Sequence, residues 1–309
     1  MPSIIKKRRI LSYGGLTLPS VGPFATSPKL VASSLPNWTI TTNTAAPAHT
    51  RANPLKFNTI DFSGGVAKTL YGYNASLFIR CNLLTRTGAV FTQIFNGGNG
   101  GYGFDEGSIG GDGSSGGGAG SAPFADGGQG GSGDDGIASD FVPGGLGYGL
   151  IYNFDYAFYP QGGNGGDGGF GISGGNFGPG GFKGNGYGGG GGGGACDAGG
   201  IQGGGGGGAG GLTVIVANES RGAIFFDVSG GGGGNGDTST GGGGGGGAGA
   251  IYLAFKKYDG LITALAAGGT GGFGFINGND GAAGTIAIYE IGRDNSLTAR
   301  TLASTWNNL

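Results

Sequence analysis

The side chains that carry catalysis in most enzymes are scarce in this chain. Its single histidine, His49, stands among Pro, Ala and Thr residues, with no cysteine or carboxylate beside it. A Ser-His-Asp or Cys-His set needs a histidine between a nucleophile and an orienting group. A phosphate-binding loop needs Gly-Lys-Ser/Thr, which the sequence lacks. We therefore expect a packed or solvated His49, no enzyme and no cofactor.

Acidic and amide side chains between glycines could instead hold a cation. Residues 162–170 fit the first six places of the calcium-binding Gly-Gly-x-Gly-x-Asp repeat, with Asp167 as the acid, but Gly169 replaces a large aliphatic residue. Two further groups could offer oxygen ligands, namely Asp134, Asp135 and Asp140, and Asn277, Asn279 and Asp280. Asn-Gly and Asp-Gly pairs are ordinary turn residues, so we expect turns rather than a metal site.

Basic residues gather near the N-terminus, where Lys6, Lys7, Arg8 and Arg9 lie between pairs of apolar residues. Residues 1–95 hold ten Lys or Arg against a single acid, Asp61, whereas the remainder holds six basic and seventeen acidic residues. A basic cluster can bind nucleic acid electrostatically. Its apolar flanks favour an arm that docks on an acidic protein surface, so we expect anchoring there rather than nucleic-acid binding.

Glycine supplies 86 of the 309 residues, including unbroken runs at 188–194, 203–208, 230–234 and 241–247. Such tracts often act as flexible linkers. Only 11% of the residues are charged, however, and 11% are aromatic, which is unlike a disordered chain. We therefore expect an ordered structure in which bare backbone is a building material.

A unit of strand, tight turn, strand and glycine tract recurs along the chain. It is clearest at 212–234 and 251–272, where Gly222 and Gly260 occupy equivalent positions, with related stretches near 77–101 and 150–169. The alternation of Leu212, Val214 and Val216 predicts half-buried strands. Glycine on every face would let extended polyproline-II-like helices pack closely enough to bond with one another. Ordering glycine costs nearly as much as such bonds return, which favours an oligomer.

The fold class we predict is all-β with irregular parts: strand repeats, solenoid-like or sandwich-like, joined by packed polyglycine-II tracts. An extended basic, proline-rich arm spans residues 1–60, a β-rich junction 61–95, the glycine-rich repeat body 96–291 and a C-terminal tail 292–309. No segment approaches the roughly 20 apolar residues that a membrane-spanning helix needs, and we expect no signal peptide.

Aromatic residues within the glycine-rich body have two interpretations, because they can shield the tracts or form a binding face. The densest group gives our candidate contact residues, Tyr148, Tyr152, Phe154, Tyr156, Phe158 and Tyr159.

The glycine runs and the strand-plus-Gly-Gly-x-Gly-Gly units over 96–291 resemble glycine-rich tail-fibre and adhesin proteins of tailed bacteriophages. The resemblance implies layered polyglycine helices whose connecting loops contact the host surface. It also implies a virion protein that binds host glycan or protein. From its charge, we expect the basic arm to anchor the chain to other virion proteins. We expect a homo-oligomer, with a trimer favoured. The alternatives are a capsid decoration or cement protein and an ice-binding polyglycine protein.

Overall fold

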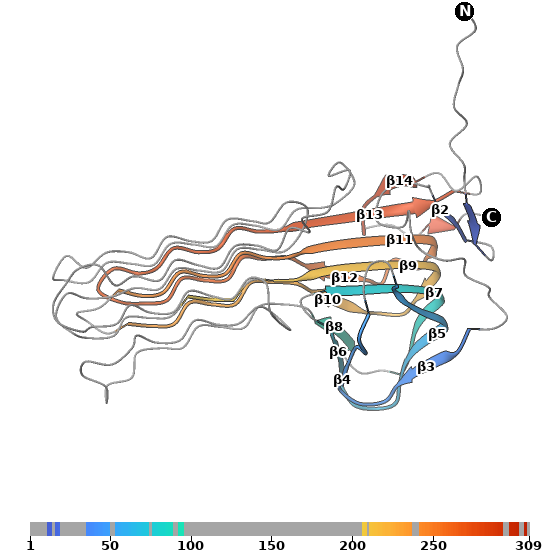
Figure 1. The fold of residues 1–309 in the computed structure, drawn as a ribbon, viewed down its shortest axis with the longest axis horizontal. Coiled ribbons are helices and arrows are strands. Elements are labelled where there is room, and N and C mark those ends of the chain that lie inside the picture. Colours follow the sequence, from blue (N-terminus) through green and yellow to red (C-terminus); the bar gives the residue numbers. More distant parts are fainter. Residues whose placement is uncertain are drawn as a thin grey trace, which may run out of the picture.

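The computed structural model describes residues 35–49, 53–73, 76–88, 92–95, 206–208, 210–236, 241–292, 297–302 and 306–307, with the backbone of 11–13 and 16–18. Within these residues all regular secondary structure is β, which confirms the all-β prediction for this part of the chain (Figure 1). A short antiparallel hairpin joins β1 (Leu11–Tyr13) to β2 (Leu16–Leu18). The remaining strands form two sheets.

The larger sheet is parallel over most of its width. Its parallel strands, in spatial order, are β13 (Thr285–Ile291), β11 (Ala250–Tyr258), β9 (Leu212–Arg221), β7 (Ser76–Thr87), β5 (Leu55–Ser63) and β3 (Asn37–Ile40). Two antiparallel strands complete it, β14 (Leu297–Arg300) beside β13 and β15 (Trp306–Asn307) beside the end of β11. The smaller sheet is wholly parallel and contains β12 (Thr263–Leu265), β10 (Phe225–Asp227), β8 (Thr92–Phe95), β6 (Lys68–Tyr71) and β4 (Thr44–Ala45).

The chain alternates between the sheets, so that each strand of the larger sheet from β3 to β11 is followed by one of the smaller sheet. Each of these strands lies beside the preceding strand of its own sheet and runs parallel to it. Leu212 pairs with Ala250 in the larger sheet and Phe225 with Thr263 in the smaller, and both pairs are 38 residues apart, like the Ser229–Ala267 contact. The two sheets therefore advance together along one axis.

Apolar side chains fill the space between the sheets. This core includes Ile60, Phe62, Ile79, Leu253 and Phe255 from the larger sheet, with Leu70, Ile94 and Phe226 from the smaller. Leu212, Val214 and Val216 lie in a second buried cluster with Tyr252. The prediction of half-buried strands is therefore wrong for residues 212–217, which are buried throughout. Parallel sheets are commonly covered on both faces, and then nearly every strand residue is buried.

Four asparagines form a hydrogen-bonded ladder across adjacent strands of the larger sheet. The Asn58 amide donates to Asn37 Oδ1 at 3.0 Å, Asn82 donates to Asn58 at 3.1 Å, and Asn218 donates to Asn82 at 2.8 Å. Each amide thus satisfies its neighbour, as in other stacked Asn arrays. The ladder fixes the register of β3, β5, β7 and β9, because a one-residue slip would break every bond in it.

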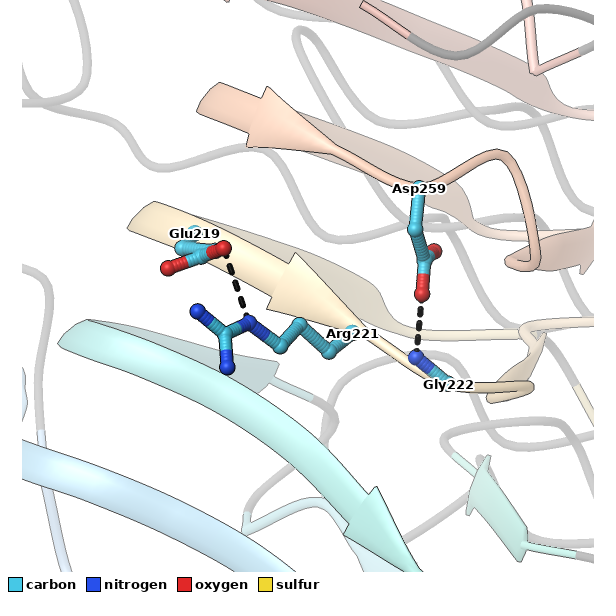
Figure 2. A network of polar contacts seen from close by, with 4 residues as sticks. All are labelled: Glu219, Arg221, Gly222 and Asp259. Carbon is cyan, nitrogen blue, oxygen red and sulfur yellow. Dashed lines mark hydrogen bonds and ion pairs between the residues drawn. The ribbon is translucent and has the colours of Figure 1, made fainter. Parts of the chain in front are cut away.

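The turns between the two sheets are tied to one another as well. Gly222 and Gly260 have φ of +84° and +82°, in the left-handed region that glycine enters without strain. Figure 2 shows Asp259 reaching across to the Gly222 backbone N–H, which donates to the carboxylate Oδ2. The other oxygen of Asp259 accepts from the Leu261 N–H at 3.2 Å. Arg221, beside this contact, pairs with Glu219 on its own strand at 2.8 Å.

The predicted boundary at residue 60 falls inside β5, and β3 and β4 before it already belong to the sheets. The strands β3, β4 and the first part of β5, all before residue 61, are therefore part of the sheets. The prolines that suggested an arm, Pro36, Pro47 and Pro54, flank these strands, where the missing amide N–H costs nothing. Of the preceding residues 1–34, only β1 and β2 are described. At the other end, β14 and β15 lie within the predicted tail.

The asparagine ladder makes a test of this arrangement. We expect Asn82→Ala to lower the free energy of unfolding by about 2 kcal/mol, because it removes two bonds, one accepted by Asn58 Oδ1 and one donated by Asn218 Nδ2. Asn37→Ala is the matched control at the exposed end of the ladder, and its cost is about 0.5–1 kcal/mol. Urea unfolding measures both. Equal effects of the two substitutions would contradict a register-setting ladder.

Candidate functional site: the glycine tracts and their distal loop

The site residues predicted from the sequence lie outside the described residues. This holds for the anchoring cluster Lys6, Lys7, Arg8 and Arg9, and for the aromatic set Tyr148, Tyr152, Phe154, Tyr156, Phe158 and Tyr159. It also holds for the candidate calcium ligands Asp134, Asp135, Asp140 and Asp167. They stay predictions. What the structure describes instead is a set of glycine tracts and one loop that connects two of them.

The described tracts run side by side away from the sheets (Figure 1). The chain leaves β10 along 228–236 and returns along 241–249 to β11, then leaves β12 along 266–273 and returns along 276–284 to β13. Residues 206–211, described except for residue 209, lead into β9. We call 241–249 the central tract and 276–284 the outer tract. Every residue from 241 to 250 is buried.

Backbone hydrogen bonds join the tracts with a period of three residues. Amides of the central tract donate to the outer tract in the pairs Gly242–Ile276, Gly245–Asn279 and Ala248–Ala282, at 2.9–3.0 Å. The next residues in each triplet donate to the outgoing tract from β10 in the pairs Gly243–Gly234, Gly246–Gly231 and Gly249–Val228, at 2.8–2.9 Å. The carbonyl groups of the remaining residues, Gly244 and Gly247, accept from Gly207 and Gly210. Each third of the central tract therefore faces a different neighbour.

At four glycines of the central tract, Gly242, Gly245, Gly246 and Gly249, the neighbouring backbones leave no room for a side chain. A Cβ atom on Gly246 would lie 2.0 Å from the Gly208 carbonyl oxygen, and one on Gly245 would lie 2.0 Å from the Gly269 carbonyl oxygen. A Cβ atom on Gly242 would likewise lie 2.0 Å from the Gly272 carbonyl oxygen. These neighbours are backbone atoms and cannot turn aside as a flexible side chain could. Glycine is required here for close approach.

The outer tract needs glycine only at every third residue. A Cβ atom on Gly278, Gly281 or Gly284 would lie 2.1, 2.1 or 1.7 Å from a carbonyl oxygen of the central tract. The pairs of residues between these glycines are exposed, namely Asn279 and Asp280, then Ala282 and Ala283. The sequence Gly-x-y in the outer tract and the nearly continuous glycine of the central tract, interrupted only by Ala248, thus reflect how many of the three faces each tract buries.

The loop between the last two tracts turns back at the end of the tracts away from the sheets (Figure 1), and it exposes large apolar side chains. We call residues 271–280 the distal loop. Phe273 is 71% exposed, Phe275 50% and Ile276 44%. Folded proteins usually bury such side chains, so a cluster of them at a loop tip indicates a contact surface. The sequence analysis did not single out these residues; the signal available was two Phe separated by one glycine within a tract.

Side chains hold the backbone of the distal loop in place. Asn235 Oδ1 accepts from the Phe273 N–H at 2.9 Å, Asn277 Oδ1 from the Gly274 N–H at 3.2 Å, and Asp280 Oδ1 from the Gly271 N–H at 2.8 Å. Asn277 and Asp280 were among the candidate metal ligands, and these bonds are turn chemistry, as the sequence predicted. Within the described residues no group of His, Cys, Asp and Glu is arranged to hold a metal ion.

The remaining reactive side chains of the described residues are built into the core. His49 is buried, with its Nδ1 2.7 Å from the Pro47 carbonyl oxygen and its Nε2 accepting from the Phe78 N–H at 3.1 Å. Both ring nitrogens are occupied, which matches the expectation of a packed histidine. Cys81 is also buried, and burial raises the pKa of its thiol, so the nucleophilic thiolate is disfavoured.

Glycine substitutions in two tracts test the packing. We expect Gly246→Ala to lower the free energy of unfolding by about 3 kcal/mol or more, because its Cβ would overlap the backbone of Gly207 and Gly208. Gly232→Ala is the control. The nearest atom to its Cβ would be Thr270 Oγ1 at 3.4 Å, an ordinary contact. That variant should be neutral or more stable by about 0.4–1 kcal/mol through reduced freedom of the unfolded chain. Thermal unfolding measures both, and equal stabilities would contradict backbone packing in the central tract.

Comparison of the chain with models of protein families, with curated proteins and with solved structures found no match. Among the described residues there is no helix of the length and apolarity that a membrane crossing requires. The functional argument therefore rests on the geometry of the tracts and the distal loop.

Proposed function

We propose that the glycine tracts are polyglycine-II helices packed in layers, and that the two sheets are a solenoid of stacked strand repeats. The support for the first is the three-residue period of the bonds between tracts, which is the period of polyproline-II geometry. The support for the second is the alternation of strands between the sheets and the Asn37–Asn218 ladder. Together they make a stiff projection held at one end by the sheets.

On this architecture the chain serves as a non-enzymatic virion protein of a tailed bacteriophage, a tail-fibre, spike or adhesin component that contacts the host surface. The observation that carries this proposal is the distal loop. A bundle of bonded backbones ends in a loop with three exposed apolar side chains and a fixed conformation. A projection that ends in an ordered loop with exposed apolar side chains suits attachment at a distance better than it suits catalysis.

The basic N-terminal cluster, Lys6 to Arg9, serves in this proposal as the anchor to other virion proteins, and the chain assembles as a homo-oligomer, with a trimer favoured. The aromatic set between Tyr148 and Tyr159 is retained as a further host-contact candidate. The distal loop adds Phe273, Phe275 and Ile276 to it.

Ice binding is a second candidate function, favoured by one observation. The outer tract exposes the small residues Ala282 and Ala283, and Thr285 at the start of β13 is exposed as well. The larger residues Asp280 and Ile286 are exposed beside them in the sequence, which does not suit a flat array of small side chains. Purified protein that produces no thermal hysteresis removes this function and leaves the virion proposal intact.

The anchor is tested by deletion of residues 2–34, which spares β3 and the strands that follow it. We expect the shortened chain to keep the β-type circular dichroism of the full chain but to be lost from purified particles. Particles that incorporate it in full would contradict the anchor assignment.

Imaging of gold-labelled protein on the particle separates tail from shell in the same preparation. A few copies at the tail fit an adhesin. Tens to hundreds on the head would instead establish the capsid decoration or cement alternative.

A further inference from the structure

Side chains occur at every third position, from Ala267 onward, in the tract that leaves β12 (residues 266–273). A Cβ atom on Gly268 would lie 1.8 Å from the Gly281 carbonyl oxygen, and one on Gly269 would lie 1.9 Å from the Gly231 carbonyl oxygen. Glycine is therefore required at two positions of each triplet. The third position is filled by Ala267, which is half-buried, and by Thr270 and Phe273, which are exposed.

The outer tract carries side chains at two positions of every three. Its glycines face the central tract, and the residues between them are exposed, namely Asn279, Asp280, Ala282 and Ala283. At Gly278, Gly281 and Gly284 a Cβ atom would lie only 1.7–2.1 Å from a carbonyl oxygen of the neighbouring tract. A further tract could bond to the exposed side only by an equally close approach, which requires glycine at the facing positions. The exposed side chains therefore keep another backbone away.

Side-chain oxygens occupy three backbone N–H groups of the tract from β12. The pairs, with the donor first, are Ala267 with Ser229 Oγ at 3.3 Å, Phe273 with Asn235 Oδ1 at 2.9 Å, and Gly271 with Asp280 Oδ1 at 2.8 Å. A side-chain acceptor satisfies the donor without bringing a further backbone alongside it. Rows of unpaired N–H and C=O groups at an edge are the template to which another chain adds. These three contacts remove part of that template.

Folded copies of the chain would join their glycine bundles readily if nothing prevented it. The tracts of each copy are already ordered, so a backbone bond between two copies would not carry the entropy cost of ordering a free chain. Such a bond is net favourable. Natural sheet proteins block their edges with charged side chains and covering segments for the same reason. A bundle built from bare backbone needs an equivalent block on its exposed side.

We propose that the last pair of tracts, residues 266–284, is a lateral cap that prevents the tracts of a second copy of this chain from joining the bundle. Its outward side chains hold another backbone beyond hydrogen-bonding distance, and Ser229, Asn235 and Asp280 occupy donors that the second copy would need. The cap acts on this side of the bundle only and leaves the proposed homo-oligomer to other surfaces. It concerns how copies pack and does not depend on attachment to a host.

The test removes the outward side chains of the outer tract in the full chain, with Asn279→Gly, Asp280→Gly, Ala282→Gly and Ala283→Gly combined. We expect the mass of this fourfold variant in sedimentation velocity to rise with protein concentration to at least double that of the parent. The association should reverse on dilution and keep the circular dichroism of the parent. Amides within residues 279–283 should exchange with solvent more slowly than in the parent, because they bond to the second copy.

The matched control is Asn279→Ala with Asp280→Ala. It removes the charge of Asp280 and its bond to Gly271, but it keeps a Cβ atom at all four outward positions. We expect its mass to equal that of the parent at every concentration. Association of this control to the same degree as the fourfold variant would overturn a cap that works by excluding backbone.

A second variant, Ala282→Gly with Ala283→Gly, allows for loss of the fold, since glycine adds freedom to the unfolded chain. It leaves Asp280 and its bond in place, and we expect a mass between those of the parent and the fourfold variant. If the fourfold variant loses the circular dichroism of the parent, this double variant decides. A folded variant with the mass of the parent, or one that associates without slower exchange in the outer tract, would overturn the cap.

Discussion

The backbone hydrogen bond between one glycine tract and its neighbour is the interaction on which the rest of this molecule depends. A buried hydrogen bond between peptide groups of neighbouring tracts contributes about 1 kcal/mol net to stability, whereas ordering the backbone of one residue costs about 1–2 kcal/mol. The cost of ordering glycine lies near the upper end of that range, because glycine has the greatest conformational freedom in the unfolded chain. A bundle of such tracts is therefore not expected to form by itself. Something must hold the tracts in register before they bond.

The two sheets provide that register, and the ladder of bonds passes from sheet to tract without a break. Asp227 pairs with Leu265 at the end of β10 and β12. The next bonds in line are those from Val228 to the Leu265 carbonyl and from Gly230 to the Ala267 carbonyl. Each described outgoing tract continues a strand of the smaller sheet, and each described returning tract leads into a strand of the larger one. The tracts that leave β10 and β12 and return to β11 and β13 are thus tied to apolar strands at both ends, which reduces the entropy lost when the tracts meet.

The sequence predicted those features that depend on local pattern. Strands with turn glycines at Gly222 and Gly260 follow from the apolar runs and from the need for positive φ, and the turn role of Asn277 and Asp280 follows from their glycine neighbours. The asparagine ladder could not be read in the same way. Its members are 21, 24 and 136 residues apart, so no period in the sequence brings them together. Burial of both faces of β9 likewise depends on segments distant in the chain.

The distal loop was missed for a related reason, which also bears on how it could work. Two Phe residues in a glycine tract can pack on the backbone and shield it, or they can project into solvent. Which of the two occurs depends on the segments packed around them. Here the outer tract is bonded to one side of the central tract, and Phe273 and Phe275 stay exposed. Complete burial of one such side chain contributes about 1.5–3 kcal/mol. The loss of translational and rotational freedom on association costs an estimated 4–15 kcal/mol. One loop would therefore hold a partner only weakly. Several identical loops on stiff stalks of one particle would bind far more tightly, with a gain of about 10²–10⁴ when all can engage together. Rigidity of the glycine bundle matters for that gain, because it fixes the distance between the tips and so decides whether simultaneous contact is possible.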